Sequence, residues 1–220
     1  VYSICVELNA LVPQFPCIPC QQIPQPVHDE PAPRFLDDTE IELALQVADK
    51  HGIGAEVRSA LLTGLRMTEL RMLAWADVHL DSRVLVVRKA KNRHYRHVAL
   101  CQSAVDVLAG QSAVTGHCRY VFPGRCRKGA TGMRGHEWWT SALKPLQEAI
   151  PKFRELPGRC TGRGWHLLRH TWFTRLAEGG ASMARISQWG GHSDVNFTRR
   201  RYAHLQEGYH DDIERVKLGS

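Results

Sequence analysis

The sequence predicts a mainly α-helical domain with one small antiparallel β-hairpin, an α+β fold. Apolar residues recur at helical spacing through most of residues 37–204, and two short runs rich in β-branched residues, 83–89 and 95–100, lie close together. The length of 220 residues is sufficient for one full-sized domain. The first 36 residues differ, because they hold seven of the eleven prolines. That density excludes regular helix and predicts a Pro-rich arm or linker over residues 1–36.

Helix-start chemistry, glycine breaks and periodicity define the elements that follow the arm. The acidic run Asp37-Asp38-Thr39-Glu40 suits the positive end of a helix dipole, and Gly52 and Gly54 end that helix. Two stretches rich in Gly and Arg, 124–135 and 157–164, are expected to be loops. In chain order we expect helices at about 37–51, 55–62 and 65–75, strands at 83–89 and 95–100, helices at 103–113 and around 138–146, and helices at 166–178, 182–190 and 194–204.

The distribution of charge indicates the kind of partner. The net charge is +7, and basic residues are concentrated between Arg83 and Arg175, while the rest of the chain is net acidic. This pattern predicts one positive surface whose natural partner is a polyanion, although a solvated basic face without a ligand is also consistent with it. No apolar run approaches the roughly 18 residues needed to cross a bilayer, so no membrane partner is expected. The seven cysteines are odd in number and irregularly spaced, which fits free thiols in a reducing compartment.

Several polar residues lie where a hydrophobic core does not require them. His166 and Arg169 are three apart on an expected helix and therefore share a face. Arg66 follows Thr63-Gly64-Leu65 at a helix start, with Glu69 three residues later able to orient it. His192 follows two glycines, and Tyr202 follows three arginines. Each motif alone also fits an ordinary helix pair, turn or core tyrosine.

Together these motifs resemble the catalytic domain of the tyrosine recombinase, or phage integrase, family. In chain order they are Thr-Gly-Leu-Arg-x-x-Glu-Leu, the basic hairpin with Lys91 and Arg96-His97-Val98-Ala99-Leu100, His-x-x-Arg-His-Thr, Gly-His-Ser and Arg-Tyr-Ala-His. The resemblance covers about residues 36–206. It implies the tyrosine recombinase catalytic-domain fold for residues 37–206, and a C-terminal tail at 207–220 that could be exchanged between protomers.

The resemblance implies a site-specific recombinase or integrase that cleaves and rejoins duplex DNA through a 3′-phosphotyrosine intermediate. Tyr202 would be the nucleophile, and Arg66 and Arg169 would hold the non-bridging phosphate oxygens. Lys91, five residues before Arg96, would protonate the leaving 5′ oxygen. The covalent intermediate would store the bond energy, so no metal, ATP or other cofactor is expected.

Two histidines complete the catalytic set that the resemblance implies. His166 would assist proton transfer, and His192 would hydrogen-bond the phosphate. Three positions depart from the family pattern without removing a catalytic group. Leu167 stands where Asp is common, Gly190 where Leu is usual, and Ala99 where Pro is frequent.

The hairpin and the two Arg-rich loops also carry candidate contacts to the DNA backbone. The candidate DNA-binding residues are Lys89, Arg93, Arg96, Arg127, Lys128 and Arg163. The resemblance further implies double-stranded DNA as partner, a homotetramer on DNA, and a monomer or weak oligomer without it. It places the protein in the cytoplasm, associated with the nucleoid of a prokaryotic host, in the biology of a mobile element.

Three other functions remain open at the level of sequence. The first is a type IB topoisomerase-like or resolvase enzyme, which uses the same chemistry with a different outcome. The second is a DNA-binding module without catalysis. The third is a metal-binding module built on Cys17, Cys20 and His28, although no second Cys pair follows at zinc-finger spacing.

Overall fold

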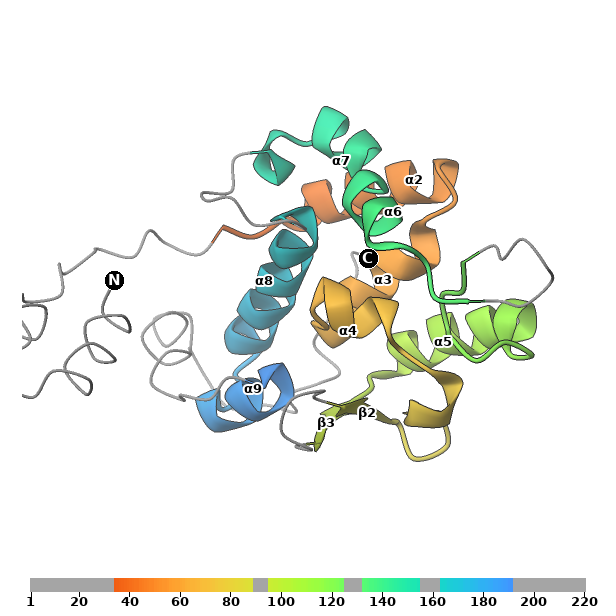
Figure 1. Cartoon of the computed structure of the whole chain (residues 1–220). Helices are drawn as coiled ribbons and strands as arrows, with labels where there is room; N and C mark the ends of the chain where they lie inside the picture. Colours follow the sequence, from red (N-terminus) through yellow and green to blue (C-terminus); the bar gives the residue numbers. More distant parts are fainter. Residues whose placement is uncertain (1–33, 89–94, 125–131, 155–162, 192–220) are drawn as a thin grey trace, which may run out of the picture. The chain divides into compact units, whose positions relative to one another are not determined.

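The computed structural model describes residues 34–88, 95–124, 132–154 and 163–191 (Figure 1). The described elements are mostly helical with one small antiparallel sheet, which confirms the predicted fold class. No helix among these residues is long and apolar enough to span a membrane. Leu36, which the sequence analysis assigns to the arm, is completely buried, and its N–H donates to Thr171 Oγ1 at 3.0 Å. The packed domain therefore already includes Leu36.

The first helices form as the sequence predicts, apart from the length of the third. Helix α2 (Asp38–Lys50) starts with a capping box between Asp37 and Glu40. Gly54 begins α3 (Gly54–Thr63) instead of breaking a helix. Helix α4 (Met67–Arg71) is much shorter than the helix expected at 65–75.

The shortening of α4 has a non-local cause. The residues after α4 pair with a segment almost fifty positions later in the chain: Ala74 forms a bridge with Tyr120, and Val121 N–H donates to the carbonyl of Leu73 at 2.9 Å. These backbone bonds hold the chain extended, and only a 3₁₀ turn, η2 (Trp75–Asp77), follows. Helical periodicity cannot reveal such a distant partner.

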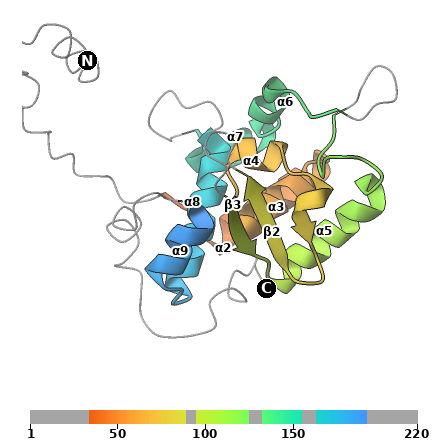
Figure 2. The same cartoon turned by 60° about the horizontal axis from the view of Figure 1, so that its bottom comes forward.

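The predicted hairpin is present as part of a three-stranded antiparallel sheet. Strand β2 (Val84–Arg88) pairs with β3 (Tyr95–Ala99), and β1 (Val78–His79), which the sequence analysis did not predict, pairs with the outer edge of β2. A strand of two residues is too short to show a period of two. Strand β3 packs beside α9, as Figure 2 shows from the side of the sheet.

The helix expected around 138–146 is two short helices. Helix α5 (Gln102–Thr115) comes first, and then α6 (His136–Ser141) and α7 (Lys144–Ala149) are separated at Leu143. Pro145 lies in the first turn of α7, where the missing N–H of proline costs nothing. The proline therefore starts a new helix. A 3₁₀ turn, η3 (Pro151–Phe153), follows.

The last described helices carry part of the candidate site. Helix α8 (Arg163–Glu178) begins inside the stretch 157–164 that the sequence analysis assigns to a loop, and α9 (Met183–Gly190) agrees with the predicted helix at 182–190. Ser182 caps α9 by accepting the N–H of Arg185. The helix expected at 194–204 lies outside the described residues.

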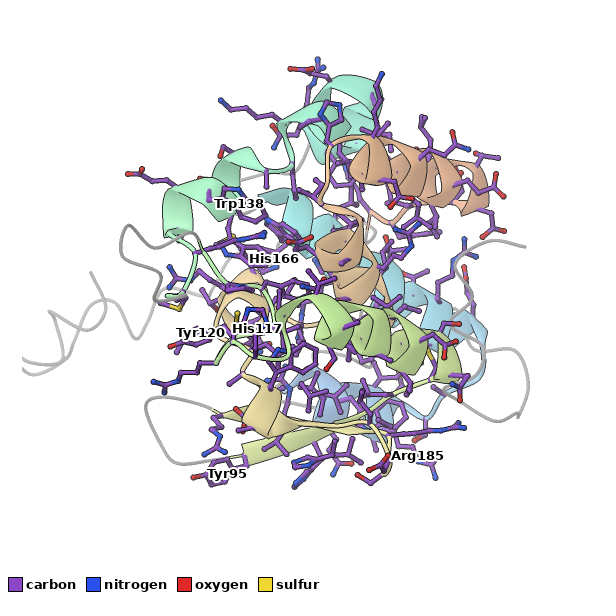
Figure 3. The ribbon with its side chains drawn as sticks, turned by 90° about the vertical axis from the view of Figure 1, so that its right-hand side faces the viewer. Tyr95, His117, Tyr120, Trp138, His166 and Arg185 are labelled. Atoms are coloured by element: carbon purple, nitrogen blue, oxygen red, sulfur yellow. The ribbon has the colours of Figure 1, made fainter. Side chains whose placement is uncertain are left out.

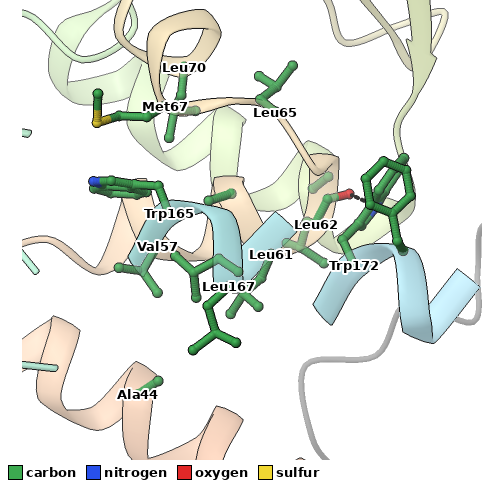
Figure 4. Close-up of a cluster of buried hydrophobic side chains, with 14 of the residues drawn as sticks. Ala44, Val57, Leu61, Leu62, Leu65, Met67, Leu70, Trp165, Leu167 and Trp172 are labelled. Carbon is green, nitrogen blue, oxygen red and sulfur yellow. Dashed lines mark hydrogen bonds between the residues drawn. The ribbon is translucent and has the colours of Figure 1, made fainter. Parts of the chain in front are cut away.

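The core is built around α3, which packs against α2, α5 and α8. Figure 4 shows Val57, Leu61 and Leu62 of α3 meeting Trp165 and Trp172 of α8. The indole N–H of Trp172 donates to the carbonyl of Leu62 at 3.1 Å, so α8 fixes the end of α3 by packing and by a hydrogen bond.

The turn between α3 and α4 requires glycine for two reasons. Gly64 has φ 60°, in the left-handed region, and a Cβ atom there would lie 2.2 Å from the Trp172 ring. Gly52 has a similar φ of 66° but nothing within 4 Å of its Cβ position. A side chain at Gly64 would therefore meet both backbone strain and a clash with Trp172, whereas a side chain at Gly52 would meet the strain alone.

We expect Gly64→Ala to lower the free energy of unfolding by about 3 kcal/mol, the sum of left-handed strain and overpacking. The matched change Gly52→Ala should cost only the strain, about 1 kcal/mol. Urea denaturation of both variants measures the difference. Equal losses for the two would show that Trp172 does not require this glycine.

Candidate active site

Arg66 is held at the start of α4 by Glu69. It is the N-cap residue in an extended conformation, and its N–H donates to Glu69 Oε2 at 2.8 Å. Its Nη1 donates to Glu69 Oε1 at 3.0 Å, and its Nη2 reaches the carbonyl of Gly191 at 3.4 Å. A third of the side chain (33%) is exposed, so the guanidinium is both oriented and accessible.

The same carboxylate binds a second guanidinium from β3. Arg96 Nη1 and Nη2 donate to Glu69 Oε1 and Oε2, each at 2.7 Å, in a bidentate pair. Arg96 Nε donates to the carbonyl of Trp189 in α9, also at 2.7 Å. Its side chain is only 9% exposed. From the sequence, Arg96 is expected to contact DNA, whereas the structure directs its guanidinium to Glu69 and the carbonyl of Trp189.

Glu69 is ionised in this environment. Burial alone would raise its pKa, but the hydrogen bonds and charge of Arg96, together with the backbone N–H and charge of Arg66, outweigh burial and lower the pKa to about 2. The carboxylate therefore stays negative at neutral pH and keeps two cations side by side.

Arg169 is fixed by backbone carbonyls. Its Nη1 donates to the carbonyl of Gly64, and its Nη2 donates to the carbonyl of Gly190 at 2.5 Å. The guanidinium stacks over the ring of Phe173, with 4.6 Å from Cζ to the ring centroid. Arg169 is buried and thus has a single well-defined orientation.

The departure from the family pattern at Gly190 has a structural counterpart. A Cβ atom at position 190 would lie 2.5 Å from the ring of Phe173, the ring on which Arg169 stacks. The adjacent Gly191 has φ 64°, and a Cβ atom there would lie 3.0 Å from the Arg96 side chain. Both glycines therefore make room for groups that carry or support an arginine.

His166 lies one helical turn before Arg169 on α8 and is exposed to solvent. Its pKa is lowered, first because neighbouring atoms exclude water from part of the ring, and then because the charges of Arg169 and Arg66 disfavour a further cation. In Figure 3 it is well separated from Tyr95, whose exposed ring lies at the edge of the sheet. The neutral imidazole is the form that can accept a proton.

The structure brings three of the six candidate catalytic residues together. Arg66 and Arg169 reach the carbonyls of adjacent residues, Gly191 and Gly190, and both charges act on His166. The other three candidate catalytic residues and four of the candidate DNA contacts lie outside the described part of the chain. They are Lys91, His192 and Tyr202, and Lys89, Arg93, Arg127 and Lys128. Arg163 is the first residue of α8, but its side chain is not described. Cys17, Cys20 and His28 also lie outside the described residues.

The site depends on groups that the sequence analysis missed. The carbonyls of Gly64, Trp189 and Gly190 accept guanidinium hydrogen bonds, and a backbone carbonyl has no sequence signature. The inward orientation of Arg96 could have been predicted from the sequence, because residues two apart on a strand share a face, and Val98 and Leu100 are buried. Among the residues with described side chains, no cluster of three or more His, Cys, Asp or Glu could hold a metal ion.

Comparison with protein-family models gives a match to the phage integrase family over residues 34–208. Prophage integrase IntZ of Escherichia coli (strain K12) is 29% identical over 195 residues, 80% of this chain and 43% of that protein. Tyrosine recombinase XerC of Xanthomonas campestris pv. campestris (strain B100) is 30% identical over 183 residues, covering 79% and 52% respectively. The chain spans about half the length of these curated relatives.

Solved structures share the fold at lower identity. The catalytic domain of bacteriophage HP1 integrase superposes with a TM-score of 0.55 and 24% identity, covering 79% of this chain and 88% of that one. The XerA recombinase gives a TM-score of 0.59 at 23% identity, over 80% of this chain and 62% of that one. The predicted tyrosine recombinase catalytic-domain fold is thereby confirmed.

The ionisation of Glu69 predicts a specific acid sensitivity. The pKa of Glu69 is about 2 in the folded protein and about 4.5 when unfolded. Its contribution to the free energy of unfolding is therefore fully present above pH 4.5 and is lost as the pH falls toward 2. Wild type should exceed Glu69→Gln in unfolding free energy by on the order of 3 kcal/mol at pH 7, with the gap closing below pH 4.5.

Urea unfolding from pH 7 to pH 3 measures this gap. Asp49→Asn is the control, because Asp49 forms an exposed bidentate pair with Arg58 and should change stability by less than about 1 kcal/mol throughout. A difference between wild type and Glu69→Gln that does not vary with pH would contradict the assignment.

Proposed function

Because this chain belongs to the phage integrase family, we propose that it is a site-specific DNA recombinase that cleaves and rejoins duplex DNA through a covalent phosphotyrosine intermediate. The observation that carries the proposal is the meeting of Arg66 and Arg169 at the C-terminal end of α9, beside His166. Two oriented guanidiniums next to a neutral imidazole suit displacement at a phosphodiester.

The arginines would act on the phosphate. Displacement at phosphorus builds negative charge on the non-bridging oxygens, and fixed cationic donors stabilise that charge without having to reorganise. Arg169 is fixed by the carbonyls of Gly64 and Gly190, and Arg66 by Glu69. Such preorganised donors contribute on the order of 3 kcal/mol each to lowering the barrier in known enzymes.

The remaining roles rest on the family motifs. Tyr202 Oη would attack phosphorus and lose its proton with the help of neutral His166. The bond from phosphorus to the 5′ oxygen would break, and Lys91 would protonate that oxygen, while His192 would hydrogen-bond the phosphate. A second 5′ hydroxyl would then displace Tyr202. One phosphoester bond forms for each that breaks, so the reaction would consume no ATP or other energy source.

We propose double-stranded DNA as the partner, with a homotetramer as the active assembly and the segment 207–220 exchanged between protomers. The charge distribution supports a polyanionic partner, since basic residues are concentrated between Arg83 and Arg175. Candidate backbone contacts are Lys89, Arg93, Arg127, Lys128 and Arg163. Such contacts release counterions, so DNA affinity should fall steeply as salt rises. Association with the nucleoid would follow from DNA binding.

The decisive test is covalent capture on DNA. The probe is a pool of nicked duplexes with randomised sequence, from which a cut end can diffuse away and leave the protein attached. We expect an SDS-resistant protein–DNA adduct with wild type and none with Tyr202→Phe. Tyr2→Phe is the matched control, because this tyrosine lies in the Pro-rich arm, outside the family match over residues 34–208, and should leave the adduct unchanged.

The outcomes separate the competing functions. An adduct that persists in Tyr202→Phe would refute the proposed nucleophile. DNA binding in a gel without any adduct would indicate a non-catalytic binding module. Relaxation of a plasmid that lacks every captured sequence would indicate a topoisomerase-like enzyme.

A further inference from the structure

Arg96 joins three elements that each lead to a candidate catalytic residue. It lies on β3, five residues after Lys91, and pairs with Glu69 of α4, which holds Arg66. Its Nε also binds the carbonyl of Trp189, near the end of α9 and three residues before His192. The hydrogen bonds of one guanidinium thus join β3, α4 and α9.

The geometry requires arginine at this position. Two parallel N–H groups meet the two carboxylate oxygens of Glu69, and Nε points in another direction to the α9 carbonyl. Lysine offers one compact ammonium and cannot reproduce this fork. Gly191 lacks a side chain where one would come within 3.0 Å of Arg96, so the end of α9 can approach the guanidinium closely.

We propose that Arg96 is a positioning residue for strand cleavage rather than a contact to the DNA backbone. It acts through Glu69 on Arg66 and through the Trp189 carbonyl on the end of α9. This inference rests on the proposed function and adds to it the group that sets the relative placement of the hairpin, α4 and α9. Its burial, at 9% exposure, leaves little surface for a phosphate to contact.

The two roles predict different behaviour in Arg96→Met and Arg96→Lys. A positioning residue sets the single-turnover rate of adduct formation at saturating DNA, because misplacement of a catalytic group by about 1 Å costs roughly 100-fold. A phosphate contact sets the dissociation constant and its salt dependence, and lysine would largely replace it. Substitution of a residue that is needed only for stability lowers the amplitude of the reaction and leaves the rate constant of the folded molecules unchanged.

The experiment measures rate, amplitude and DNA affinity on one captured duplex for each variant. We expect both Arg96→Met and Arg96→Lys to slow adduct formation by roughly 10- to 100-fold, with dissociation constants and salt slopes within about twofold of wild type. The control is Arg58→Gln, which removes another bidentate Arg–carboxylate pair, between α3 and α2, and should leave the rate unchanged.

The possible failures are distinct. A normal rate in Arg96→Lys, or weaker binding with a reduced salt slope and an unchanged rate, would overturn the positioning role and favour a DNA contact. A loss of amplitude alone would reduce Arg96 to a structural residue. If wild type forms no adduct on any duplex, the proposed function itself fails, and the role of Arg96 in cleavage fails with it.

Discussion

The site depends on the ion pairs of the partly buried Glu69 carboxylate. Neighbouring guanidiniums repel each other, and Glu69 offsets this repulsion by accepting hydrogen bonds from both Arg66 and Arg96. Arg169 instead uses carbonyls, which orient a cation without neutralising it. Three guanidiniums with one carboxylate leave a net positive site, which is what an anionic phosphate requires. The pKa of Glu69, at about 2, keeps this balance unchanged across physiological pH.

The hydrophobic core and the site are built from the same helices. Helix α8 buries Trp172 against the end of α3, and the same helix carries Arg169 to the carbonyl of Gly64. The turn after α3 is therefore shaped by packing before it serves the site. Phe173 continues this arrangement, since its ring occupies the space beside Gly190 and supports Arg169. Substitutions that change core packing along α8 are thus expected to displace the arginine side chains of the site.

Local patterns predicted most of the described helices and the hairpin, because spacing and turn chemistry act over a few residues. The convergence of Arg66 with Arg169, 103 positions apart, was implied only by the resemblance to the tyrosine recombinase family. The failures have non-local causes. Helix α4 is short because Ala74 pairs with Tyr120, and β1 is too brief to show alternation. The low exposure of Arg96 was not predicted, because a charged residue on a basic hairpin is usually exposed. Arg96 is held in the interior by Glu69, 27 positions away. The alternation of the strand did indicate this, because Arg96 lies on the same face as the buried Val98.

The coupling between Glu69 and Arg96 tests the central claim most directly. It is measured by a double-mutant cycle with Glu69→Gln, Arg96→Met and the double variant, each unfolded in urea at pH 7. A partly buried bidentate pair that organises the site should show a coupling free energy of about 1.5 kcal/mol or more. Additive losses, within about 0.5 kcal/mol, would mean that the two side chains act independently and that something else holds the arginines together.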